Sequence, residues 1–256
     1  MTKKFTIKFK LLFRKLYYIF REDAIVQITN PEILRGYKWI ESIEYGRSYY
    51  KGYYELDLLR CLAYFLKKDS VFFDVGGHAG YIALYGSRLA NQVFTFEPKE
   101  SNYHFSKRII ALNSIQNILS FQMAVGSRSG KLFFENGLTS STGKMSAKGT
   151  IPVEVISIDE FIHTNRIDKV DLVKIDVEGF GAEVLKGMVI AIEKFKPIIF
   201  YEIHNNDEFI EIKNLMSSGY CLYTTDLRPA RLDSLAEQFV IALPSNAKFI
   251  EAAISY

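Results

Sequence analysis

The sequence predicts an α/β protein built on one wound, mostly parallel sheet that closes with an antiparallel edge hairpin. Two observations predict this fold class. Short apolar runs alternate with segments of helical spacing from residue 55 to residue 218, and a glycine-rich loop follows the first of these runs. A length of 256 residues fits one large domain of this kind, and an apolar content of 48% is sufficient for its core.

The first half of the pattern contains helices and strands in strict alternation. Residues 22–50, which contain the turn signals Asn30-Pro31, Gly36 and Gly46, are expected to form an irregular connection. The expected helices are 55–68, 81–89 and 101–112, and the expected strands are 71–75, 92–96 and 118–124.

The alternation is interrupted by a predicted insertion at residues 126–156. Its first part, 126–149, is rich in Ser, Gly and Lys and predicts a hairpin with an exposed loop, and 152–156 predicts a further strand. After it we expect helices at 157–163, 182–195 and 207–218, strands at 171–175 and 197–203, and an antiparallel edge pair at 220–224 and 239–243. The domain expectation is an arm and connection over 1–50 and a catalytic domain over 51–256.

The first 21 residues have an unusual charge pattern. They contain seven Lys or Arg residues and no acid, whereas the rest of the chain is mildly acidic. On a helical wheel one face is apolar and the opposite half is basic; the apolar face holds Phe5, Phe9, Leu12, Phe13, Leu16, Ile19 and Phe20. Such a helix either lies on an anionic membrane surface or packs on its own domain or on a second subunit.

Composition excludes several classes of protein. No stretch approaches the roughly 18 to 20 apolar residues of a membrane-spanning helix. No basic patch recurs after residue 21, so nucleic acid is not an expected partner. Cys61 and Cys221 match no metal or redox spacing, which favours a reduced, cytoplasmic setting, peripheral to the inner membrane face if the arm binds lipid.

The glycine loop at residues 71–81 is the most informative segment. An apolar strand leads into Gly76 and Gly77, and Gly80 begins a helix, a loop that brings backbone close to a ligand at the carboxyl end of the sheet. His78 replaces the second glycine of the dinucleotide motif, and no P-loop Gly-Lys follows. Asp74 at the strand end would repel a diphosphate.

A second acid, Glu97, ends the next strand. A carboxylate at this position can accept hydrogen bonds from both hydroxyl groups of a ribose. An acid, a glycine loop and a second acid suit a nucleoside whose other end is an amino acid, and S-adenosylmethionine fits that description.

The motifs, taken in order, resemble those of the FkbM family of S-adenosylmethionine-dependent methyltransferases. They cover about residues 52–222 and read GYYE at 52–55, DVGGHAGY at 74–81, EPKESN at 97–102, AVGSRSG at 124–130, SIDEF at 157–161, KIDVEG at 174–179, VLKGM at 184–188 and YEIH at 201–204. The resemblance implies the class I methyltransferase (Rossmann-like) fold. It implies a cofactor site formed by Asp74, Gly76, Gly77, His78 and Gly80, by Glu97 and Asn102 of the EPKESN motif, and by Met123 and Ala124 near the adenine.

Two positions depart from the family pattern. Gly77, His78 and Ala79 replace the last variable residues of the usual DVGANIG loop, and Gly181 stands where an acid is usual. His78 either meets the methionine carboxylate or is a surface turn residue.

The residues expected to act in methyl transfer follow the later strands. Asp176 and Glu178 follow one strand, and Glu202 and His204 end the next, two residues apart and therefore on one face. His204, expected to be neutral with an ordinary pKa near 7, is the predicted base; the alternative is a capping or structural histidine. Asp176 is expected to position the acceptor and Glu178 to fix a turn. A divalent cation shared by Asp176 and Glu202 is an alternative that the motif does not require.

The family's chemistry implies methylation of a hydroxyl on a glycan or on a secondary metabolite. If the basic arm binds a membrane, a lipid-linked glycan is the favoured acceptor. Acceptor choice is expected to lie in residues 139–148 and in the tyrosines of 45–54, which would otherwise be packing residues; these are Tyr45, Tyr49, Tyr50, Tyr53 and Tyr54. The rival interpretations are methyl transfer to nitrogen or to a carboxylate, and a catalytically silent, cofactor-binding scaffold subunit of a glycan assembly complex.

Overall fold

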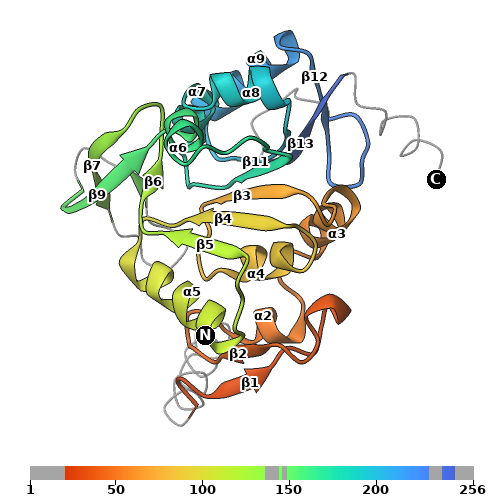
Figure 1. The fold of residues 1–256 in the computed structure, drawn as a ribbon, viewed down its shortest axis with the longest axis vertical. Helices are drawn as coiled ribbons and strands as arrows, with labels where there is room; N and C mark the ends of the chain where they lie inside the picture. Colours follow the sequence, from red (N-terminus) through yellow and green to blue (C-terminus); the bar gives the residue numbers. More distant parts are fainter. Residues whose placement is uncertain (1–20, 136–143, 146–148, 231–237, 246–256) are drawn as a thin grey trace, which may run out of the picture.

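A seven-stranded sheet organises the computed structural model, which describes residues 21–135, 144–145, 149–230 and 238–245 (Figure 1). Its strand order is β12-β13-β11-β10-β3-β4-β5. The parallel strands are β3 (Val71–Val75), β4 (Gln92–Phe96), β5 (Ile118–Phe121), β10 (Leu172–Ile175) and β11 (Ile198–Ile203). The antiparallel strands are β12 (Tyr220–Tyr223) and β13 (Gln238–Pro244). The expected wound fold with an antiparallel edge pair is confirmed.

Helices cover both faces of this sheet (Figure 1). On one face lie α3 (Leu56–Phe65), α4 (Tyr81–Ser87) and α5 (Glu100–Leu112); on the other lie α6 (Ile158–Thr164), α7 (Gly181–Lys186), α8 (Val189–Phe195) and α9 (Asn206–Ser217). Side chains alternate along each strand, so Phe72 joins the core under the first group and Phe73 joins the core under the second. Both layers are therefore fixed to the same strands.

The order of the strands reverses between β3 and β10. From β3 the chain proceeds outward to β4 and β5, and it then returns to β10 on the other side of β3 and proceeds to β11. In a wound sheet such a reversal leaves a crevice beyond the carboxyl ends of the two central strands, because the connections leave in opposite directions. The crevice here lies after Val75 and Ile175.

Residues 22–50 are more regular than predicted. They form β1 (Ile25–Gln27) paired with β2 (Lys38–Ile40), a 3-10 turn η1 (Glu32–Leu34) and the short helix α2 (Arg47–Lys51). The cause is Trp39, which is fully buried with its ring 5.1 Å from Tyr49, 5.6 Å from Tyr81 and 5.4 Å from Phe105. This segment shares its core with α4 and α5, so the predicted boundary at residue 50 does not separate two cores.

The predicted helix over 182–195 is two helices, α7 and α8. A Cβ at Gly187, between them, would overlap the carbonyl oxygen of Gly126, so the break is where another segment approaches the backbone. The Asp159 carboxylate then accepts the backbone N–H groups of Ile190 and Ala191 at 3.0 and 2.8 Å, which caps α8 from a distant part of the sequence.

The predicted strand over 118–124 also divides. Its end, β6 (Ala124–Val125), leaves the main sheet and pairs in parallel with β9 (Ile151–Ile156) of the insertion, which also contains β7 (Gly130–Glu135) and β8 (Lys144–Met145). The antiparallel pair β7–β8 confirms the predicted hairpin. Residues 136–143 and 146–148 of its predicted loop, and nearly all of the basic arm, lie outside the described residues.

Among the residues that the structure describes, no helix has the length and apolar character needed to cross a membrane.

Trp39→Ala tests whether the N-terminal segment belongs to the main core. Removing this buried ring is expected to lower the free energy of unfolding by about 3 to 5 kcal/mol, measured by urea unfolding followed by circular dichroism. Tyr53→Ala is the control, because Tyr53 is 74% exposed and its loss should change stability by no more than about 0.5 kcal/mol. Equal, small effects of both variants would show that the segment is not part of the core.

Candidate active site

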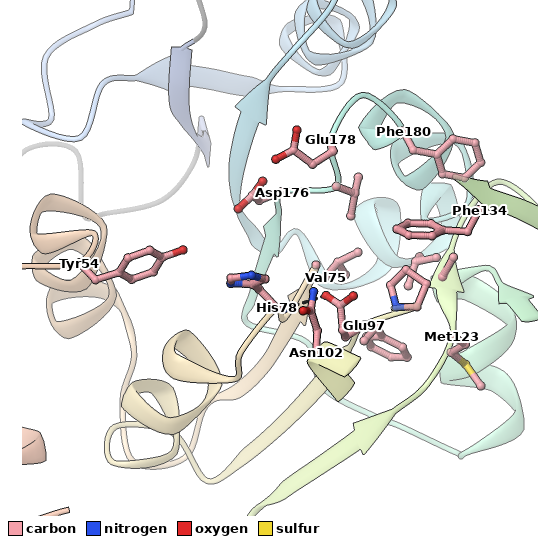
Figure 2. Close-up of a pocket in the computed structure, with 16 residues that line it drawn as sticks. Tyr54, Val75, His78, Glu97, Asn102, Met123, Phe134, Asp176, Glu178 and Phe180 are labelled. Atoms are coloured by element: carbon pink, nitrogen blue, oxygen red, sulfur yellow. Dashed lines mark hydrogen bonds between the residues drawn. The ribbon is translucent and has the colours of Figure 1, made fainter. Parts of the chain in front are cut away.

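A cleft opens at the carboxyl ends of β3, β4 and β10 (Figure 2). The residues that line it are Tyr54, Val75, Gly76, His78, Phe96, Glu97, Pro98, Asn102, Met123, Ala124, Val125, Phe134, Asp176, Val177, Glu178 and Phe180. Six of the nine predicted cofactor residues are among them, together with Asp176.

The glycine loop fits only because Gly76 and Gly77 lack side chains. Gly76 has a φ of +83°, and a Cβ there would overlap the carbonyl oxygen of Asp176; at Gly77 a Cβ would overlap the Thr95 hydroxyl. Both backbone N–H groups donate to the carbonyl of Phe96, at 3.0 and 2.9 Å. The loop is thus held against the ends of both β4 and β10.

The other three predicted cofactor residues do not line this cleft. Asp74 is fully buried in register with Lys174 of β10 and Thr95 of β4, and the Thr95 hydroxyl donates to it at 3.3 Å. Gly80 begins α4 against Ser106, and Gly77 lines a separate small cavity with Tyr49, Tyr81 and Lys174. Direct contact of Asp74 with the cofactor stays a prediction; in the structure this acid supports the loop.

Glu97 keeps hydrogen-bonding capacity toward the cleft. Its two oxygens accept the backbone N–H groups of His78 and Lys99, each at 2.8 Å, which leaves other lone-pair directions of the carboxylate. Burial raises the pKa of Glu97 to about 7, although these N–H groups oppose the rise. Asn102 is held in place by the hydroxyl of Tyr45, which donates to its Oδ1 at 2.6 Å.

His78 is not the surface turn residue that the sequence allowed. Its ring lies between Tyr45 and Tyr49, with Nδ1 3.3 Å from the Tyr49 hydroxyl, and Nε2 is buried without a hydrogen-bond partner. Burial lowers the pKa of His78 to about 4, so the ring is neutral at pH 7. A buried ring nitrogen beside the cleft needs a polar partner, which a water molecule or a ligand can supply. The predicted contact with the methionine carboxylate stays a prediction.

The opposite end of the cleft is apolar. Figure 2 shows Met123, Phe134 and Phe180 around that end, with His78 farther away and Glu97 between. Phe134 and Phe180 were not among the residues predicted for the site. Phe134 lies in the apolar run 132–134 of the insertion, but only the docking of β7 against the main sheet brings it here, and no sequence signal marks Phe180.

The predicted catalytic residues gather at one edge of the cleft. His204 Nε2 lies 3.8 Å from Asp176 Oδ1 and 3.7 Å from Glu202 Oε1, and Nδ1 lies 3.6 Å from Glu208 Oε2. Asp176 lines the cleft directly, whereas Glu202 and His204 are not among its lining residues. Glu178, expected only to fix a turn, also lines the cleft, from a residue with a φ of +47°.

The charges around His204 favour a protonated ring, whereas the sequence led us to expect a neutral one. Burial alone would lower its pKa, but Glu208, whose Oε2 lies 3.6 Å from Nδ1, and the charges of Glu202 and Asp176 outweigh burial and raise it to about 9. Burial and the Asp176 charge raise the pKa of Glu202 to about 7. Glu202 is therefore the group of the cluster whose pKa lies nearest 7, and the surroundings of His204 favour its protonated ring.

Glu208 gives the cluster its rigidity. It is fully buried, and its oxygens accept the backbone N–H groups of Gly181, His204 and Asn205 at 2.7, 2.6 and 3.2 Å. It closes a capping box at the start of α9. A side chain at Gly181 would meet Glu208 Oε1 at 2.9 Å, which explains why this chain has glycine at a position that departs from the family pattern.

A cation could also be held at this edge. Asp176, Glu178 and His204 can each offer one ligand atom, and these atoms lie within 4.8 Å of one another. Glu202, which the sequence paired with Asp176 for this role, is not in the group. Since a metal would displace the ring proton of His204, a metal and an imidazolium are alternatives at this position.

The tyrosines of 45–54 divide between packing and the cleft. Tyr45, Tyr49 and Tyr50 are buried, as the packing interpretation expected, whereas Tyr54 lines the cleft opposite Asp176 (Figure 2). Tyr53 is exposed. Residues 139–148, expected to choose the acceptor, lie outside the described residues except for the backbone of 144–145.

The cleft suits the two halves of S-adenosylmethionine. Its apolar end can take a base, Glu97 can accept from ribose hydroxyls, and the unpaired Nε2 of His78 lies where an amino-acid end would follow. Between these groups lies the glycine loop, which leaves no space for a Cβ at residue 76.

Comparisons with known proteins agree with this fold. The family model "Methyltransferase FkbM domain" matches residues 74–229. A hexuronic acid methyltransferase, AglP of Haloferax volcanii, is 31% identical over 197 residues, which are 75% of this chain and 78% of that protein. The crystal structure of an FkbM methyltransferase from Methylobacillus flagellatus is similar in fold, with a TM-score of 0.52 and 16% identity over 69% of this chain and 44% of that chain.

Gly76→Ala is expected to weaken binding of S-adenosylhomocysteine by roughly tenfold to a hundredfold, because the new methyl group must displace the loop or Asp176. Calorimetric titration measures this loss. Gly36→Ala is the matched control, since Gly36 also has a positive φ, of +87°, but has no atom within 4 Å of its Cβ position. Equal affinity of the two variants would contradict a cofactor site at the loop.

The raised pKa of Glu97 predicts a pH dependence of cofactor binding. Below pH 7 the carboxyl group takes up a proton and loses an acceptor for the ribose, so affinity for S-adenosylhomocysteine should fall by up to roughly tenfold per pH unit and level off above pH 7. Glu97→Gln should bind weakly with little change between pH 6 and 8. A wild-type affinity that is flat over this range would place the ribose elsewhere.

Proposed function

Because the chain belongs to the FkbM methyltransferase family, whose methyl donor is S-adenosylmethionine, we propose that it methylates an oxygen of a hexuronic acid residue in a glycan. The named activity of the relative from Haloferax volcanii supports this sugar class. The observation that carries the proposal is the Asp176–Glu202–His204 cluster at the edge of the cofactor cleft.

For a hydroxyl acceptor the three residues would act together. The bound cofactor supplies a methyl group on a sulfonium, which the acceptor oxygen must approach in line. Asp176 faces the cleft and would accept the hydrogen bond of the acceptor hydroxyl. Asp176 would pass that proton to Glu202, the carboxyl group with the higher pKa, near 7, and the charge of His204 favours the ionised form of Glu202 that can receive it. This assigns His204 a different role from the base that the sequence predicted.

The acceptor carboxylate is a second candidate nucleophile. A hexuronic acid is already ionised at pH 7, so its methylation needs no base. Transfer to nitrogen has no support from a sugar of this class.

The experiment is incubation of the purified chain with methyl-labelled S-adenosylmethionine and a hexuronic-acid-containing oligosaccharide, followed by mass spectrometry. Labelled product is expected. Mild alkali then distinguishes the two oxygens, because a methyl ester is hydrolysed and a methyl ether survives. Cofactor binding without transfer to this or any other glycan would instead favour the silent scaffold.

Glu202→Gln tests the proton acceptor. For a hydroxyl acceptor, kcat should fall by about 10² to 10⁴, with affinity for S-adenosylhomocysteine nearly unchanged, because Glu202 does not line the cofactor cleft. Glu193→Gln, on the exposed face of α8, is the control. If the Glu202→Gln variant still forms the methyl ether with the wild-type kcat, Glu202 is not the proton acceptor.

A further inference from the structure

Lys174 carries a positive charge in the middle of the sheet. It lies in β10, in register with Asp74 of β3 and Phe200 of β11, and only 3% of its surface is exposed. No step proposed above uses it. Burying an ammonium is costly unless its donors are paired, so its partners indicate what it does.

Three acceptors surround the ammonium. Lys174 Nζ donates to the carbonyl of Gly76 at 3.2 Å and lies 3.5 Å from Asp74 Oδ1 and 3.4 Å from Asp176 Oδ2. An ammonium has three N–H groups, so one acceptor is available for each. Burial lowers the pKa of Lys174, but the charges of Asp176 and Asp74 outweigh burial and hold it above its usual value.

These acceptors belong to different parts of the site. Gly76 is the glycine of the cofactor loop that overlies the end of β10, and Asp176 is the carboxylate that faces the cleft on the acceptor side. Asp74 lines neither cavity at the loop and is a buried counter-charge. One cation therefore contacts both the cofactor side and the acceptor side of the cleft.

We propose that Lys174 is a positioning residue, whose ammonium fixes the Gly76 carbonyl and the Asp176 carboxylate relative to each other. Cofactor binding and orientation of the acceptor then depend on one buried group. The rival interpretation is that Lys174 only neutralises Asp74 and serves stability. The proposal concerns the cofactor cleft and does not depend on which acceptor is methylated.

The two interpretations differ in a charge-balanced double variant. Lys174→Met alone leaves two buried carboxylates without their cation, and both stability and binding should fall. Lys174→Met with Asp74→Asn removes the ammonium together with its buried counter-charge, and stability should recover most of the loss. If Lys174 positions Gly76 and Asp176, affinity for S-adenosylhomocysteine should stay about tenfold to a hundredfold below wild type.

Calorimetry with S-adenosylhomocysteine and urea unfolding give the two readouts. Lys169→Met is the matched control, since Lys169 pairs with Asp69 and Asp171 at the opposite end of the same strand and should leave binding unchanged. Binding restored to wild type together with stability would overturn the proposal. If the double variant does not fold, Lys174→Gln with Asp74→Asn, whose amides can hydrogen-bond to each other, takes its place with the same two outcomes.

Discussion

The close contact between Gly76 and Asp176 is the constraint on which the site depends. These residues end β3 and β10, the two strands between which the sheet reverses its order, and there is no room for a side chain between them. The loop can follow this path only with glycine in a left-handed conformation. The contact sets the cofactor loop against the backbone of Asp176, the residue that carries the first acceptor-side carboxylate, so in the proposed reaction the methyl donor and the acceptor would meet at a junction that the fold itself creates.

Electrostatics divides the cleft into three parts. Neutral His78 and Glu97, whose pKa is near 7, lie in the middle, aromatic and aliphatic side chains lie at one end, and the groups held ionised lie at the other edge. At that edge buried cations alternate with carboxylates: Lys174 lies between Asp74 and Asp176, and His204 lies between Asp176, Glu202 and Glu208. Asp176 thus has a cation on each side, which lowers its pKa despite burial. A group held ionised in this way is a poor base but a good anchor for a hydroxyl, which is why the proton is assigned to Glu202.

The sequence predicted most of the fold and part of the site. Strand ends that carry Gly76, Glu97 and Asp176 could be placed together because parallel strands end at one edge of a sheet. The breaks at Gly187 and after Phe121 could not be predicted, since each is caused by a segment distant in sequence. The position of Phe134 in the cleft could not be predicted either, because it depends on how the insertion docks. His204 was found, but its protonation was not, because that depends on Glu208. The capping pattern of Asn205 and Glu208 would have been the signal for that neighbour. Lys174 gave no signal, because a lysine in a short strand normally faces water.

A crystal structure of the chain with S-adenosylhomocysteine would test most directly whether the cleft is the cofactor site. We expect the adenine between Met123, Phe134 and Phe180, the ribose hydroxyls on Glu97, and the sulfur directed toward Asp176, with the amino-acid end beside His78. A ligand bound with its ribose away from Glu97, or with its sulfur remote from Asp176, would contradict the assignment of the cleft and the methyl-transfer geometry built on it.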